Sequence, residues 1–462
     1  MSKLVKDSVL KTMIRMAVPM LAGTFALNAY NLTDTWFVSR LGTDNLAAMS
    51  YTFPVVMLLG FVLRGISTGS MALVAHALGG KRQKTAARLT THAIFLTSGI
   101  SIIILIAGFL TVNLLFATLG ASGEVLVLTR KYMYIWYGGI IFLSVQILIC
   151  DIIIGTGNTI QSSLLMVSGT LANVVLDYIM IFGHLGFPAM GIRGAALATI
   201  SAQTLVLLAA LYIVHHKHGL ITLVSFNFKR ILISWYRILR MGIPSVLSTI
   251  LTPISAGVVT RIVSGYGDPT VAACGVASRI EMFAFMIPMT VGMSMVPFVA
   301  QNFGAKRFDR IRIARRGAMI FALVFGFAAA GVFFVTIKHL AVIFTSDPEV
   351  ENVLIRYICI TCFGYGFLEV HRYAGFCMTG IHEPLISALL NMVRVFALLV
   401  PLSLLGSITI GLSGVFYGRL LTDILSGIIG VIWSGRVLKS KVSRAILLSR
   451  GNSGQLIVGS GN

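Results

Sequence analysis

Long apolar segments recur along the chain, separated by short stretches of charged residues, Gly, Pro or Asn. Each segment has about 20 residues or more, the length that an α-helix needs to cross the hydrocarbon core of a membrane. We therefore expect an all-α polytopic membrane protein. The pattern predicts twelve transmembrane helices, near 13–38, 46–75, 90–116, 129–155, 164–183, 194–214, 238–263, 271–298, 317–345, 354–378, 385–406 and 411–434.

The composition supports this class. Of the 462 residues, 57% are hydrophobic and only 11% are charged, and the mean hydropathy is +0.92. These values leave too few polar side chains to cover a soluble domain. A secreted disulfide scaffold, a coiled coil and a disordered regulator are excluded as well.

Basic residues alternate between the predicted connections in a way that fixes the orientation. One alternating set holds twenty-four Lys and Arg residues, in the segments 3–15, 81–88, 217–240, 306–316 and 436–450. The opposite set holds six, namely Arg40, Arg130, Lys131, Arg193, Lys338 and Arg356. The positive-inside rule then places both termini in the cytoplasm, with the chain in a plasma membrane, which we take to be a bacterial inner membrane. The formal charge of +21 is explained by basic loops that face membrane lipids, so no nucleic-acid partner is expected.

The two halves of the chain repeat. One ungapped shift aligns VAHALGGKR (74–82) with VAQNFGAKR (299–307), and it also places Pro19 on Pro244. The repeated unit is six helices, which predicts two parallel six-helix bundles, a transporter architecture. We expect an N-terminal lobe over 1–214, a cytoplasmic connector over 215–237, a C-terminal lobe over 238–440 and a cytoplasmic tail over 441–462. The last twelve residues are rich in Gly, Ser and Asn and are predicted to be loose.

The repeat breaks at two acidic residues in the N-terminal half. Under the alignment, which needs small gaps in its later part, Asp34 falls opposite Val259 and Asp177 opposite Val400. Polar residues recur at helical spacing around both acids and on a third span, and they include Asn28, Asn31, Asn173, Thr199 and Gln203. Carboxylates at membrane depth are costly and usually serve proton or ion traffic. The cluster could take up protons or hold a sodium ion among its oxygens; a static hydrogen-bond network is the alternative.

The second half has other intramembrane charges. Glu369 and Arg372 are three residues apart and are expected to pair on one helix face. Glu281 is either a carboxylate that contacts substrate or the partner of an arginine such as Arg394. In the first span, Pro19 permits a bend, and we expect ion loading at Asp34 to change the shape of this hinged helix.

Several segments together resemble the multidrug and toxic compound extrusion (MATE) family, DinF-like branch. They include YNLTDTWFVSRLG (30–42), GTGNT (155–159), NVVLDYIMIFG (173–183), MGIRGAALAT (190–199) and SRIEMFAFMIPM (278–289). The resemblance implies a V-shaped pair of six-helix lobes that exports organic compounds, driven by proton or sodium influx. It also implies that the ion-coupling residues are Asp34, Asn173, Asp177 and Thr199. Glu281 and Glu369 remain candidates because other branches use acids in the C-terminal lobe.

The leading interpretation is a monomeric antiporter that exports amphipathic, often cationic drugs in exchange for H⁺ or Na⁺, without a cofactor. A flippase or exporter of lipid-linked or specialised metabolite precursors is the alternative, although only six arginines are available inside the predicted spans. An intramembrane enzyme is disfavoured because no nucleophile–base pair or HExxH-like metal helix is evident. Cys359 and Cys362 lie in an apolar run without a second ligand pair, so we expect no metal site there.

Overall fold

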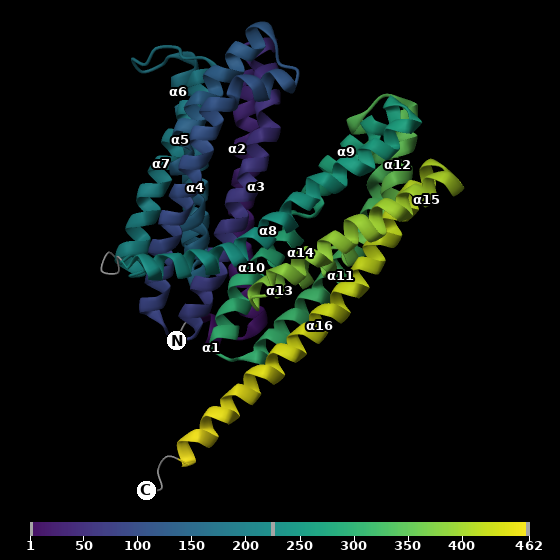
Figure 1. Cartoon of the computed structure of the whole chain (residues 1–462). Coiled ribbons are helices and arrows are strands. Elements are labelled where there is room, and N and C mark those ends of the chain that lie inside the picture. The colour runs from purple at the N-terminus through teal and green to yellow at the C-terminus, as the bar shows by residue number, and fades with distance from the viewer. Residues whose placement is uncertain (1–2, 223–226, 459–462) are drawn as a thin grey trace. The chain divides into compact units, whose positions relative to one another are not determined.

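The computed structural model describes residues 3–222 and 227–458, with side chains described from Leu4 to Ser443. The described chain is helical, without strands, and confirms the predicted fold class (Figure 1). Its first eight α-helices are α1 (Lys3–Lys6), α2 (Val9–Ser39), α3 (Thr43–Gly79), α4 (Gln83–Thr118), α5 (Gly123–Thr156), α6 (Thr159–Phe182), α7 (Ile192–Tyr212) and α8 (Phe228–Val263). The others are α9 (Asp268–Ala284), α10 (Met286–Gly304), α11 (Phe308–Phe344), α12 (Pro348–Thr361), α13 (Tyr365–Gly380), α14 (Pro384–Met392), α15 (Val400–Ile410) and α16 (Leu412–Val458).

Among the described residues, eleven helical segments are long and apolar enough to cross a membrane, and the bent pair α9 and α10 brings the number to twelve if it is counted as one span. The two helices of this pair meet at an angle of 55°. Pro288 lies one turn past the break, and a proline ring excludes the carbonyl four residues earlier from the helix hydrogen-bond ladder. The predicted span at 271–298 is therefore a broken helix.

The internal repeat is visible in the helix boundaries. Helices that begin at Thr43, Gln83, Gly123 and Thr159 have counterparts that begin at Asp268, Phe308, Pro348 and Pro384. All four pairs are related by the same shift that aligns the two halves of the sequence. The spans differ in detail, because the counterpart of α6 contains a π-helical turn over Val393–Leu399. The same backbone plan is thus used twice with different local geometry.

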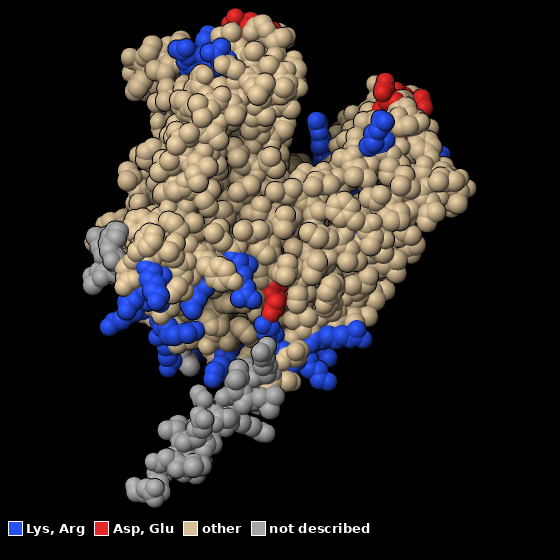
Figure 2. All heavy atoms as spheres, in the orientation of Figure 1, with Lys and Arg blue, Asp and Glu red and all other residues tan. Residues whose placement is uncertain are grey.

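The chain forms two compact units. The N-terminal unit comprises residues 1–250 and 296–305, and the C-terminal unit comprises residues 251–295 and 306–462. In the N-terminal unit, α5 is the most buried span and contacts α3, α4, α6 and α7. In the C-terminal unit, the span made of α12 and α13 is the most buried, and α13 contacts α11, α14 and α16. Figure 2 shows most of the visible Lys and Arg side chains at one end of each unit, as the alternating connections predict, with smaller groups toward the opposite ends.

The C-terminal helix differs from its prediction. Instead of ending in a loose segment over 451–462, α16 continues as backbone helix to Val458, and residues 459–462 lie outside the described part of the chain. Extending an existing helix costs far less than nucleating one, which lets the long span carry its helix into the tail.

Two glycines allow helices of the N-terminal unit to pack close together. A Cβ atom on Gly23 of α2 would lie 3.1 Å from Met166 Sδ of α6. A Cβ atom on Gly194 of α7 would lie 2.4 Å from the Met180 carbonyl oxygen of α6. Glycine therefore permits the close contacts that bring α2 and α7 against α6.

We predict that Gly194→Ala destabilises the protein, because the Met180 carbonyl is backbone and can move only with its helix. Overpacking of this kind costs about 1–3 kcal/mol. The melting temperature of the purified protein in detergent measures the effect. Gly138→Ala is the matched control, since a Cβ there meets nothing within 4 Å; equal melting temperatures for the two variants would contradict the prediction.

Candidate functional site

The acidic cluster of the N-terminal unit is built from α2, α6 and α7. Asp34 on α2 is 4% exposed, Asn173 and Asp177 on α6 are fully buried, and Thr199 on α7 is 4% exposed. Asn173 and Asp177 are four residues apart and share one face of α6. An electrostatic interaction links Asp34 with Asp177 across the two helices. The structure thus brings together the four residues that the sequence singled out.

Several polar atoms of this cluster lack partners within the described chain. Both carboxylate oxygens of Asp177, Oδ1 of Asp34, and Oδ1 and Nδ2 of Asn173 are buried without a hydrogen-bond partner among the described residues. The described part of the chain also supplies neither acid with an ion pair. A buried carboxylate without a counter-charge or donor is strongly unfavourable, so a proton or a metal cation is needed to neutralise it.

Two tyrosines belong to the same site, and the sequence analysis missed both. Tyr30 Oη lies 3.0 Å from Thr199 Oγ1, and this contact joins α2 to α7. Asp34 and Asp177 act electrostatically on Tyr30 and on the buried Tyr132 of α5. Tyr30 precedes Asp34 by four residues, so the helical period could have revealed it. Tyr132 comes from a different helix, and no spacing signal links it to the acids.

The other polar candidates of the first half lie outside this contact set. Asn28 donates to the Thr24 carbonyl oxygen one turn earlier, at 3.1 Å. Asn31 is exposed, and Gln203 is partly buried one turn from Thr199 on α7. The helix α2 continues through Pro19, which lies 15 residues, or roughly 22 Å along the axis, from Asp34.

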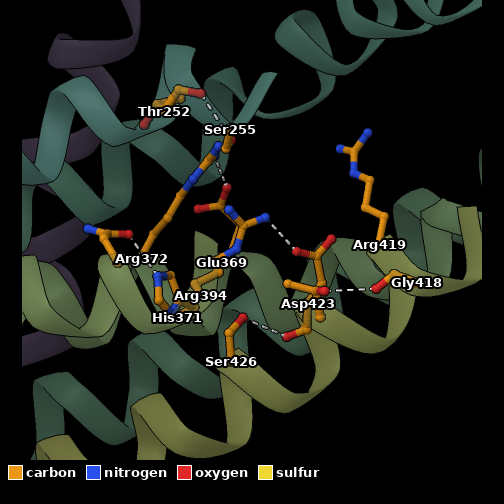
Figure 3. A network of polar contacts seen from close by, with 12 residues as sticks. Thr252, Ser255, Glu369, His371, Arg372, Arg394, Gly418, Arg419, Asp423 and Ser426 are labelled. Atoms are coloured by element: carbon orange, nitrogen blue, oxygen red, sulfur yellow. Dashed lines mark hydrogen bonds and ion pairs between the residues drawn. The ribbon is translucent and has the colours of Figure 1, made fainter. Parts of the chain in front are cut away.

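The buried acids of the C-terminal unit are paired with arginines instead (Figure 3). Glu369 binds Arg372, with 2.5 Å between Oε1 and Nη1, and this predicted pair is present. Asp423 of α16 binds Arg394, with 2.7 Å between Oδ1 and Nη2. His371 contacts Asn391 in the same region, at 2.9 Å. The sequence analysis overlooked Asp423, although it is an acid in the middle of the last predicted span.

Glu281 is held by three donors. Its Oε1 accepts hydrogen bonds from Tyr365 at 3.0 Å and from Tyr357 at 3.4 Å. Its Oε2 pairs with Arg419 at 2.9 Å. The suggested partner Arg394 was therefore wrong. Arg394 lies in the π-helical segment and pairs with Asp423 on α16. Arg419, which is on the same helix as Asp423, pairs with Glu281 on α9.

We predict opposite stability effects for the two kinds of acid. Glu281→Gln leaves the Arg419 guanidinium without its counter-charge, which costs about 3–5 kcal/mol for a buried pair. Asp34→Asn removes an unpaired charge and should leave stability unchanged or raise it. Thermal denaturation in detergent measures both. The double variant Glu281→Gln/Arg419→Met should recover part of the loss, and destabilisation by Asp34→Asn equal to that of Glu281→Gln would refute the distinction.

Among the described residues, no three His, Cys, Asp or Glu side chains gather as a metal site. At the N-terminal cluster, the oxygens of Asp, Asn and Thr side chains are of the type that can hold a sodium ion.

Comparison with known proteins identifies the class. The MatE family model matches residues 19–179 and again residues 244–405. The starts of the two matches, at Pro19 and Pro244, are related by the same shift that aligns the halves in the sequence. The chain therefore belongs to the MatE family. Members of this family are membrane transporters, not enzymes, and the long apolar helices agree with a multi-pass membrane protein.

Individual relatives match most of the chain. A protein of Shewanella oneidensis named "FAD transporter" is 29% identical over 418 residues, which covers 90% of this chain and 92% of that protein. The "Probable multidrug resistance protein YoeA" of Bacillus subtilis is 25% identical over 370 residues and covers 78% of this chain and 79% of that protein. The crystal structure of the Vibrio cholerae MATE transporter VcmN in the bent form matches with a TM-score of 0.88 at 26% identity, covering 94% of this chain and 97% of that chain.

Proposed function

We propose that this protein is an ion-coupled exporter of amphipathic, often cationic organic compounds. The observation that carries the proposal is the buried pair Asp34 and Asp177, which has no ion-pair partner within the described chain. Relatives named as multidrug resistance proteins support an efflux role. The proposed coupling site consists of Asp34, Asn173, Asp177 and Thr199, with Tyr30 as an additional member, and the coupling ion is H⁺ or Na⁺.

The coupling step follows from charge. An inward-moving cation neutralises the carboxylates, and a cationic substrate competes for the same negative charge. An empty cluster is costly in a low-dielectric site. The transporter therefore switches between its inward and outward openings mainly when the cluster is loaded, and this couples the inward movement of the ion to the outward movement of the substrate. Pro19 serves as the proposed hinge of α2, and the cluster stands on the same helix. Glu281 and Glu369 have fixed arginine partners and are proposed to keep the C-terminal unit together.

The setting proposed for this activity is a bacterial inner membrane, with both termini in the cytoplasm and the protein working as a monomer within the DinF-like branch. The proposed lobes are 1–214 and 238–440, joined by the connector at 215–237. Twenty-four basic residues in the connections of one side, against six on the other, support this orientation.

We predict that Asp34→Asn and Asp177→Asn each lower gradient-driven efflux at least tenfold, because an amide cannot exchange a proton or balance a cation. Proteoliposomes loaded with ethidium, with a pH gradient or a sodium gradient imposed separately, measure the rate. Asp151→Asn is the matched control: Asp151 is also an acid in an N-terminal span, but it accepts a hydrogen bond from Ser67 at 2.6 Å. Efflux that survives both cluster substitutions would sink the N-terminal coupling site.

A second candidate function is export of a phosphate-bearing aromatic metabolite such as FAD. The relative named "FAD transporter" suggests it, and Arg279 is the observation that favours it. Arg279 lies twelve residues into α9, is exposed, and makes no ion pair within the described chain. A free guanidinium at membrane depth usually faces an aqueous cavity and suits a phosphate. A lipid-pyrophosphate flippase is less favoured, because Arg372, Arg394 and Arg419 are already bound to acids.

We predict that Arg279→Gln reduces FAD uptake or counterflow at least tenfold if FAD is a substrate, since a charge-assisted hydrogen bond contributes about 1.5–3 kcal/mol. Ethidium transport by the same variant should be unchanged. Radiolabelled FAD counterflow in proteoliposomes measures the effect, with Arg356→Gln as the control for loss of one positive charge. Absence of FAD counterflow in wild-type vesicles that export ethidium would reject this candidate.

A further inference from the structure

A basic pocket on the N-terminal unit is lined by none of the residues of the acidic cluster. It is a cavity of about 460 Å³ lined by α5 and the start of α7. Half of its lining is cationic and half is apolar or aromatic. The lining residues are Val127, Arg130, Lys131, Tyr134, Ile135 and Arg193.

The connections on this side of the protein contain few basic residues, yet this pocket is strongly basic. The connections on this side contain six Lys and Arg residues, and three of these six line the one pocket. Membrane proteins are depleted of basic residues on this side, so the clustering calls for a ligand. None of the three cations makes an ion pair with a described acid. Glu124, in the first turn of α5, is exposed and does not neutralise them through an ion pair either.

The geometry of Arg130 gives a second, independent indication. Its guanidinium carbon lies 6.0 Å from the centroid of the Tyr134 ring, at the outer limit of a cation–π contact. Its Nε atom is buried and has no hydrogen-bond partner within the described chain. A buried donor of this kind is costly unless an acceptor occupies the site.

The three cations lie within the first three turns of α5 and α7, toward the ends of these spans. Arg130 and Lys131 are seven and eight residues from the first residue of α5, or about 11 Å along the axis. Arg193 is the second residue of α7. Tyr134 and Ile135 lie seven and eight residues, or about two turns, after Val127 on α5, and the three line the pocket beside the cations. A phosphate next to a hydrocarbon chain fits this combination, whereas a free phosphate would use only the cationic half.

We propose that this pocket binds the phosphate headgroup of an anionic phospholipid, with one acyl chain against Val127, Tyr134 and Ile135. Arg130, Lys131 and Arg193 hold the phosphate oxygens, and Arg130 Nε supplies the donor that otherwise lacks a partner in the described chain. The proposal does not depend on which substrate or ion the protein moves, because the pocket lies outside the acidic cluster.

The test compares two triple variants that remove the same charge. Arg130→Gln/Lys131→Gln/Arg193→Gln removes the pocket cations, and Arg40→Gln/Lys338→Gln/Arg356→Gln removes the other three basic residues of that side. Phosphatidylglycerol or phosphatidylcholine is titrated into detergent-purified protein, and bound lipid is counted by native mass spectrometry. Each basic contact is worth about a fivefold change in affinity. The pocket variant should therefore lose at least 25-fold in phosphatidylglycerol affinity, with little change in the control.

A single variant and a competition with inorganic phosphate complete the test. Should the pocket triple variant fold poorly, Arg193→Gln is used in its place, since Arg193 is exposed and its loss should lower the affinity about fivefold. Equal phosphatidylglycerol affinity in the pocket and control variants would overturn the proposal. Competition by inorganic phosphate at millimolar concentration that removes all bound phosphatidylglycerol from the wild type would also overturn it, because the acyl chain would then contribute nothing. Loss of this lipid site with ethidium efflux intact would separate it from the proposed transport function.

Discussion

The structure depends on one electrostatic constraint, which is that a carboxylate buried at membrane depth must be neutralised by a cation or a proton, or be held by hydrogen-bond donors. The C-terminal unit meets it with fixed arginines, because Glu369, Glu281 and Asp423 each bind a guanidinium within 3 Å. The N-terminal unit holds Asp34 and Asp177 without such a partner in the described chain. Under the proposed function, its neutralising proton or cation comes from solution. The same requirement is then met by a static network in one half and by the proposed exchangeable site in the other.

Duplication of the six-helix unit made it possible for one half to pair its buried acids with arginines and for the other half to leave them unpaired. Four helices of the first half and their counterparts in the second begin at equivalent positions under one constant shift, yet that shift places the apolar residues Val259 and Leu402 opposite Asp34 and Asp177. Side chains could therefore change in one copy while the positions of the helices stayed the same. Within the N-terminal unit, Gly23 and Gly194 let α2 and α7 approach α6, so that acids on different helices share one electrostatic environment. The packing of small residues therefore sets the geometry on which the charge argument rests.

Much of this fold was readable in the sequence, and the limits of that reading are physical. Apolar length predicted the spans, and spacings of three and four residues predicted that Asn173 and Asp177 share a face. Local pairs such as Glu369 and Arg372 were predictable for the same reason. Cross-helix partners were not, because rotation and register between helices depend on packing that spacing does not encode. Tyr132, the Arg394–Asp423 pair and the choice of Arg419 by Glu281 were found only in three dimensions.

The contrast between the halves also bears on how coupling is enforced. If Asp34 and Asp177 had arginine partners, an incoming cation would have to displace a guanidinium whose loss would itself be costly. Without them, the cluster is stable only while it holds a proton, an ion or a cationic substrate, and the unloaded state is the least favourable one. A transporter whose unloaded site is costly exchanges one cation for another more readily than it returns empty. A pair of acids without fixed counter-charges among the described residues is thus the physical basis for the antiport proposed at this site.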